Sequence, residues 1–142
     1  MVNVFIDAIA LKINAELGEG FTIYKEVQEQ GFDLPCFFIF LNTSKQKKMI
    51  GKRYFREQQF VIEYHPGTGG KKAQINAMIP RLNTALEYVA AEGDMFTGSK
   101  MSCEVIGEVL HFYVNYNYHV YEPANALETM EDVELDSRLK VE

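Results

Sequence analysis

Apolar residues recur every three or four positions in two parts of the chain, which is the spacing of a helix with one buried face. The first part spans residues 2–17, for which Asn3 is the expected N-cap and Gly18 the expected end. The second part spans residues 71–91 and contains Pro80. The pattern therefore predicts two helices, the second of them kinked by its proline.

Elsewhere the apolar residues alternate with polar ones or run together, as they do in strands. The predicted strands are residues 21–25, 36–41, 53–65, 101–109 and 110–121. The 36–41 strand is apolar at every position, whereas a strand with one buried face alternates. We therefore expect both of its faces to be covered, by helices of the same chain or by another subunit. Residues 42–48 are polar and basic, which predicts a loop.

The predicted order is helix, strand, strand, strand, helix, strand, strand. This order lacks the strand–helix–strand regularity of a doubly wound fold, and it favours an α+β fold. We expect a small, mostly antiparallel sheet of about four or five strands, flanked by two helices. Residues 1–122 are assigned to this single domain, and residues 123–142 to an acidic C-terminal arm.

Composition and charge exclude several classes of protein. The 142 residues, 47% hydrophobic and 24% charged, are typical of one globular domain. No apolar run approaches the roughly 20 residues of a membrane span, and the N-terminus does not resemble a signal peptide. The net charge of −6 argues against sequence-independent nucleic-acid binding, which depends on Lys and Arg.

Candidate catalytic and metal-binding groups are few. Cys36 and Cys103 lie in apolar strand segments and are expected to be buried free thiols. His111 and His119 are eight positions apart on one predicted strand, or about 27 Å, which is too far to share a metal ion. Cys103 and His111 are expected on opposite faces of neighbouring strands. No catalytic residue, metal or cofactor is therefore predicted.

Charge is spread unevenly along the chain. Six of the fourteen basic residues lie between positions 45 and 56, with no acid among them, and seven acids lie between positions 122 and 142. These two segments are expected either to be solvated or to contact each other, within one chain or around a homo-oligomer, where charges set orientation. The candidate interface residues are Lys45, Lys47, Lys48, Lys52, Arg53, Tyr54, Phe55, Arg56, Phe37, Ile39, Glu131, Asp132, Glu134 and Asp136.

Several segments have a familiar spacing. They are Leu34-Pro35-Cys36-Phe37-Phe38-Ile39, Gly51-Lys52-Arg53-Tyr54-Phe55, the run from Phe60 to Pro66, and the run from Gly107 to Asn117. Over residues 3–122 the chain resembles the tail terminator, or tail completion, proteins of contractile-tailed phages and of prophage elements of Gram-positive bacteria. The resemblance implies a small antiparallel sheet flanked by helices, in agreement with the order predicted above.

The resemblance also implies a structural, non-catalytic role in the virion. Such proteins form a hexameric ring on the completed tail tube, stop its polymerisation, and present a surface to the neck or head connector and to the last sheath ring. The implied partners are further copies of the chain, the tube protein, the sheath protein and neck proteins. DNA would only pass through the lumen, and no membrane is involved. The implied location is the neck-proximal end of the tail, after assembly in the host cytoplasm.

Two alternatives stay open. The chain could be a different neck or head–tail joining protein, which shares the class but not the position. It could also be a small intracellular enzyme or ligand-binding domain that acts through Cys103 or a histidine. Rings in solution favour the assembly proteins, whereas a monomer with a deep polar pocket and a reactive thiol favours the enzyme.

Overall fold

The computed structural model describes residues 1–26 and 30–121. In this part of the chain the elements are α1 (Val2–Leu17), β1 (Thr22–Tyr24), β2 (Cys36–Lys48), β3 (Arg53–His65), α2 (Lys71–Ala85), β4 (Tyr88–Ala91), β5 (Asp94–Ile106) and β6 (Val109–Tyr121). The described strands form one six-stranded sheet in the order β1-β2-β3-β6-β5-β4. β1 runs parallel to β2 and the other neighbours are antiparallel, so the sheet is mixed. The α+β class is confirmed, and the predicted number of strands is too low.

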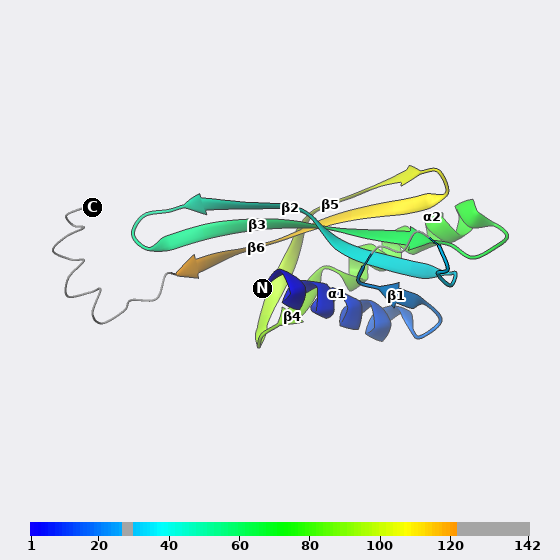
Figure 1. Cartoon of the computed structure of the whole chain (residues 1–142), viewed down its shortest axis with the longest axis horizontal. Helices are drawn as coiled ribbons and strands as arrows, with labels where there is room; N and C mark the ends of the chain where they lie inside the picture. Colours follow the sequence, from blue (N-terminus) through cyan, green and yellow to red (C-terminus); the bar gives the residue numbers. More distant parts are fainter. Residues whose placement is uncertain (27–29, 122–142) are drawn as a thin grey trace.

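Both helices pack on one face of the sheet and enclose the core (Figure 1). α1 contributes Phe5, Ile9 and Ile13, all fully buried. The sheet contributes the alternating apolar positions of β3 and β6, as the pattern predicted: Phe60, Ile62, Tyr64, Leu110, Phe112, Val114 and Tyr116. Burial of apolar surface between these layers is the main force that holds the domain together.

The helices depart from prediction at their ends. α1 has the predicted bounds, but its N-cap is Met1, which makes no side-chain capping bond, and Asn3 lies inside the helix. α2 ends at Ala85, because the next residues form β4 and not a further turn of helix. Gly93, which lies two residues beyond the helix predicted at 71–91, adopts φ +82° in the turn between β4 and β5, a conformation that glycine reaches without strain.

Residues 42–48 continue β2 and do not form the predicted loop. β2 pairs with β3 from Cys36 opposite His65 to Lys48 opposite Tyr54, with one bulge between Leu41 and Thr43. Backbone hydrogen bonds hold this half of the strand, so the polar side chains that suggested a loop do not prevent pairing. Beyond Thr43 the strand is exposed at every position up to its end.

The apolar start of β2 is covered on both faces by its own chain. Phe37 and Ile39 face the helices and belong to the core. On the other face, the ring of Phe38 lies 5.1 Å from the ring of Tyr24 and 5.3 Å from that of Phe32. Offset and edge-to-face rings at such distances attract each other. No second subunit is therefore needed to bury this part of the strand.

One buried hydrogen bond joins the sheet to the segment after α2. The Tyr116 hydroxyl donates to the carbonyl oxygen of Leu86 at 2.6 Å, and the Tyr116 side chain is fully buried. Burial raises the pKa of the Tyr116 phenol well above its usual range. The phenol therefore stays protonated and keeps donating at any pH the fold tolerates.

Tyr116→Phe is expected to lower the free energy of unfolding by about 1–2 kcal/mol, because it leaves the Leu86 carbonyl buried without a donor. Urea unfolding at neutral pH measures this loss. Tyr121→Phe is the control, since the Tyr121 side chain is 67% exposed. Equal unfolding midpoints for the two variants would contradict the assigned role of the hydroxyl.

Candidate assembly interface

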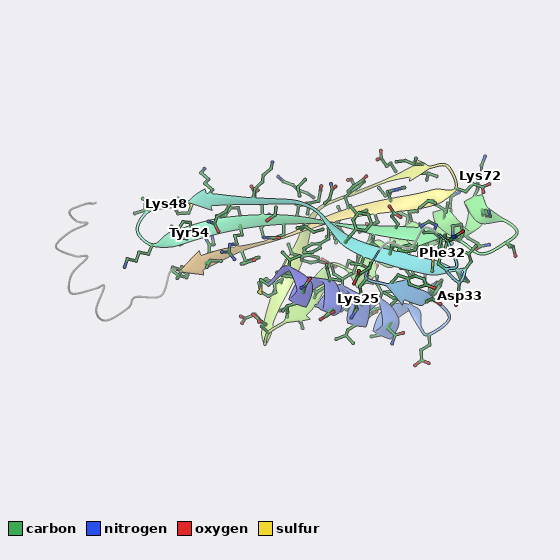
Figure 2. The ribbon with its side chains drawn as sticks, in the orientation of Figure 1. Lys25, Phe32, Asp33, Lys48, Tyr54 and Lys72 are labelled. Atoms are coloured by element: carbon green, nitrogen blue, oxygen red, sulfur yellow. The ribbon has the colours of Figure 1, made fainter. Side chains whose placement is uncertain are left out.

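β2, β3 and β6 extend past the helices as a three-stranded ribbon (Figure 1). We define the ribbon as residues 42–48, 53–57 and 117–121. Figure 2 shows Lys48 and Tyr54 at its distal end, opposite the end of the molecule that holds Phe32, Asp33 and Lys72. With 13 residues in each of these strands, about half of every strand lies outside the core. The ribbon therefore lacks the helix packing that covers the rest of these three strands (Figure 1).

The ribbon carries the basic residues predicted from the sequence. Lys45, Lys47, Lys48 and Lys52 are exposed, and among the described residues no carboxylate lies within 4.0 Å of their ammonium groups. Arg56 is half-buried and donates from Nε to Gln46 Oε1 at 2.7 Å. The Nε atom of Arg53 is buried without a hydrogen-bond partner in the described chain. The ribbon thus presents positive charge that its own described neighbours do not neutralise.

Apolar side chains accompany this charge at the tip. Ile50 is 90% exposed and Tyr121 is 67% exposed, and both line a shallow hollow together with Lys52 and Arg53. Further along the ribbon, the Phe55 ring lies 4.9 Å from the His119 ring. Exposed aromatic and aliphatic groups beside arginine are typical of protein–protein interfaces.

Some of the predicted interface residues are not on this surface. Phe37 and Ile39 are 0% and 1% exposed, because they pack under α1 in the core, so they are dropped from the candidate interface. Their place in an apolar strand gave no sign of which face would meet a helix. The acidic candidates Glu131, Asp132, Glu134 and Asp136 lie outside the described residues. Tyr54 and Phe55 are half-buried on β3 within the ribbon.

A polar hollow of about 240 Å³ lies where the ribbon meets the body, on the face away from the helices. It is lined by Thr43, Lys45, Glu57, Gln59, Lys100 and Asn115. Asn115 is 93% buried, and its Oδ1 has no partner among the described residues. The register places Lys45 opposite Glu57, yet the two charges are not within 4.0 Å of each other. The hollow therefore presents two ammonium groups and the Glu57 carboxylate to a polar group from outside.

The sequence reasoning missed Lys100 and Asn115. Lys100 sits in the irregular part of β5 between Ser99 and Ser102, with φ +52°. Only the pairing of β5 with β6, and of β6 with β3, brings it near Lys45. No local pattern in the sequence carries this information.

The comparison with known families decides what kind of protein this is. A model of the phage tail terminator protein family matches residues 5–128. The chain belongs to the phage tail terminator family. The match covers α1 from residue 5 onward, α2 and all the described strands, and it confirms the family suggested by the residues at 34–66 and 107–117. A search of curated proteins finds no match.

Membership gives this tail terminator a structural role as a component of a virion tail. The family is one of structural proteins, which agrees with the absence of a predicted catalytic residue. Among the described residues, no three His, Cys, Asp or Glu side chains are placed to hold a metal ion. None of the helices in the described ranges is both long and apolar enough to cross a membrane.

Cys103 and His111 of the terminator are not placed to form a nucleophilic pair. Cys103 lies opposite Phe112 and Glu104 opposite His111, so Cys103 and His111 are on opposite faces, as predicted. His111 Nε2 instead lies 3.4 Å from Glu63 Oε2, and His65 Nε2 lies 3.3 Å from Glu63 Oε1. The prediction that Cys103 is buried is wrong: Cys103 is exposed, as are its neighbours at this end of β5.

The two thiols are expected to differ sharply in reactivity. Cys36 is fully buried, and burial together with the nearby Asp33 and Glu63 carboxylates raises its pKa to about 11. At pH 8 a thiol reagent should therefore label Cys103 alone in the native protein and both cysteines after unfolding. Mass spectrometry of the labelled protein measures how many cysteines carry the label. The native Cys103→Ser variant should stay unlabelled. Rapid native labelling of Cys36 would contradict its burial.

The raised pKa of Cys36 also sets a pH dependence. The thiol ionises near pH 9 in the unfolded chain and only near pH 11 in the folded one. The stability that this difference represents is present below pH 9 and is lost as the pH rises from about 9 to about 11. Cys36→Ala should remove this alkaline component from a series of unfolding curves, whereas Cys103→Ala should leave it unchanged.

Proposed function

We propose that this chain forms a ring, hexameric as in the proteins it resembles, that caps the tail tube and ends its polymerisation. In a contractile tail the same ring would meet the last sheath ring on one side and the neck or head connector on the other. DNA would pass through its lumen without specific binding. The observation that carries this proposal is the ribbon: three paired strands that project from the core and bear lysines with no carboxylate partner among the described residues.

A ring of identical copies needs two different surfaces on each copy, since its contacts run head to tail. The ribbon supplies two such surfaces. Along one side, no described strand pairs with β2 beyond residue 38, because β1 pairs only with residues 36–38. Along the other side, no strand in residues 1–26 or 30–121 pairs with this side of β6 after Tyr116, because β5 leaves it at Gly98. One domain of 142 residues is too small to encircle a tube, so the functional unit must contain several copies.

Light scattering after size-exclusion chromatography, together with negative-stain microscopy, tests the proposal with and without tube protein. We expect closed rings, and a monomer under both conditions would contradict them. Deletion of the gene separates this role from that of a joining protein. Loss of a terminator should give tails of uncontrolled length, whereas loss of a joining protein should leave tails of normal length without heads.

Charge reversal on the ribbon is expected to disturb assembly and leave the monomer folded. In the triple variant Lys47→Glu, Lys48→Glu and Lys52→Glu, all three altered side chains are exposed and belong to no core contact. We expect the oligomer fraction to fall on the order of tenfold, since like charges placed across an interface oppose association. Circular dichroism and thermal unfolding should match the wild type.

Lys48→Glu and Lys72→Glu form a matched pair for this test. Both lysines are exposed, one at the distal end of the ribbon and one on α2 at the opposite end of the molecule (Figure 2). We expect Lys48→Glu to weaken assembly and Lys72→Glu to leave it unchanged. Equal effects of the two variants would mean that net charge, and not the ribbon, controls association.

A further inference from the structure

We propose that the free edge of β2 binds residues 131–136 of a second copy as an additional strand. This inference rests on the proposed ring, and it names the contact that links one copy to the next. Four observations on the described residues and on the sequence carry it: an unpaired strand edge, unneutralised lysines, a polar hollow beside them, and an acidic segment with matching spacing.

The edge is available over most of the length of β2. β3 pairs with one side of the strand from Cys36 to Lys48, and β1 pairs with the other side only at residues 36–38. Residues 39–48 therefore have no strand on their second side within the described structure. Such an edge presents backbone N–H and C=O groups that can hydrogen-bond to an incoming extended segment.

The charges on this edge select the kind of segment that can bind. Thr43, Lys45 and Lys47 share the face away from the helices, because their register partners on β3 are Gln59, Glu57 and Phe55. Lysines on an edge strand repel another basic strand and disfavour an apolar one. An acidic strand is favoured, since opposite charges on directly opposed residues stabilise a strand pair.

The polar hollow lies beside the same face of β2. Lys45 belongs both to the edge and to the hollow, and Lys100 and Asn115 complete the polar lining from β5 and β6. The Oδ1 atom of Asn115 is buried without a partner among the described residues. The lining also includes the Glu57 carboxylate. A carboxylate carried by the incoming strand would therefore meet two ammonium groups and one carboxylate here, so attraction still prevails.

The chain itself contains a segment with the required pattern. Residues 131–136 read Glu-Asp-Val-Glu-Leu-Asp, and Asp132, Glu134 and Asp136 recur at every second position. In an extended strand such residues lie on one face, with Val133 and Leu135 on the other. This period of two is also the spacing of Thr43, Lys45 and Lys47, so one register brings the two sets together.

A second copy is the better source of this segment. The described chain ends at Tyr121 on β6, and β3 separates β6 from β2. In a head-to-tail ring, however, the β6 side of one copy faces the β2 edge of the next. Residues 122–130 can span about 30 Å when extended, which is enough to reach a neighbouring edge. Docking on the same chain is the rival outcome that the experiments below detect.

Two reciprocal charge variants test the inference by mixing. One carries Lys45→Glu with Lys47→Glu, and the other carries Glu134→Lys with Asp136→Lys. We expect each variant alone to lose oligomer roughly tenfold or more. We expect an equimolar mixture to recover it, because each contact then joins opposite charges between copies. Failure of the mixture, with recovery only when all four changes share one chain, would overturn docking between copies.

A disulfide placed across the contact gives an independent readout. In a Cys103→Ser background, Ser44→Cys and Val133→Cys are combined and the protein is oxidised. A ladder of covalent multimers on a non-reducing gel supports the inference, and either cysteine alone should give at most dimers. A cross-linked monomer would overturn it in favour of docking within one chain. Rings that form without any cross-link would overturn this contact but would not affect the proposed function. Wild-type protein that forms no ring even with tube protein would overturn the proposed function itself.

Discussion

Replacing Phe5 with alanine is expected to lower the free energy of unfolding by about 3–5 kcal/mol. The Phe5 side chain is fully buried on α1, and its ring meets four other aromatic rings. The ring centroids of Phe96, Tyr118, Phe60 and Tyr116 lie 4.9, 5.5, 5.7 and 5.7 Å away. These partners come from β3, β5 and β6, so truncation would open a cavity where α1 joins three strands of the sheet.

Urea unfolding followed by circular dichroism measures the effect of Phe5→Ala. Leu11→Ala is the matched control, because Leu11 lies on the same helix but is 71% exposed. We expect the control to change stability by less than about 1 kcal/mol. A similar loss in both variants would contradict the role assigned to the aromatic cluster around Phe5, because alanine favours the helix at both positions.

Replacing Gly98 with alanine is the second large effect that we expect. A Cβ atom at this position would lie 2.6 Å from the Leu86 carbonyl oxygen and 2.9 Å from both Val114 Cγ2 and Met101 Cε. The Leu86 carbonyl cannot easily move, because it accepts the hydrogen bond of the buried Tyr116 hydroxyl. The Gly98 N–H also donates to the Glu87 carbonyl at 2.7 Å, which fixes the backbone of Gly98 itself.

We expect Gly98→Ala to cost about 1–3 kcal/mol of stability, as overpacked substitutions in cores do, and Gly98→Val to cost more. Thermal unfolding of both variants measures this. Gly20→Ala is the control, since no atom lies within 4 Å of a Cβ built there. If Gly98→Ala unfolded like Gly20→Ala, the close passage of β5 over the end of α2 would be wrong.

Strong apolar periodicity made much of the fold predictable. The bounds of α1 and β3 match the predicted 2–17 and 53–65, and β6 differs by one residue. Apolar residues keep one spacing over at least three turns in α1, from Leu110 to Val120 in β6, and from Phe60 to Tyr64 in β3. The apolar positions in the sequence then match the buried side chains in the structure, because one face of each element lies against the core.

Prediction failed where one residue fits two patterns or where side chains do not decide the structure. Val89 continues the helical stripe of α2 and also alternates correctly in β4, so periodicity alone could not end the helix. Residues 42–48 form a strand through backbone pairing with β3. Cys103 points to the same face as Phe112 but is exposed, because alternation reveals the face of a strand and not whether a helix covers it.

The candidate interface was predictable from charge but not from hydrophobicity. The lysines between positions 45 and 52 mark the ribbon, since basic side chains with few neighbouring acids stay at the surface. The apolar character of both faces of their strand marks Phe37 and Ile39 as candidate contacts, yet α1 and the aromatic residues of the same chain cover this strand. The hollow at Lys100 depends on the register of three strands and has no local signal.

The bulge divides β2 into a half that packs in the core and a half that lies in the ribbon. Asn42 is the extra residue, and its Nδ2 donates to Gln59 Oε1 at 2.7 Å. Before it, odd-numbered residues point into the core, and after it they point to the opposite face. If Asn42 were paired and the register continued without the bulge, Lys45 would lie opposite Arg56 and not opposite Glu57. The first half of β2 is therefore free to specify folding and the second half association, so either half can diverge between related phages without forcing changes in the other.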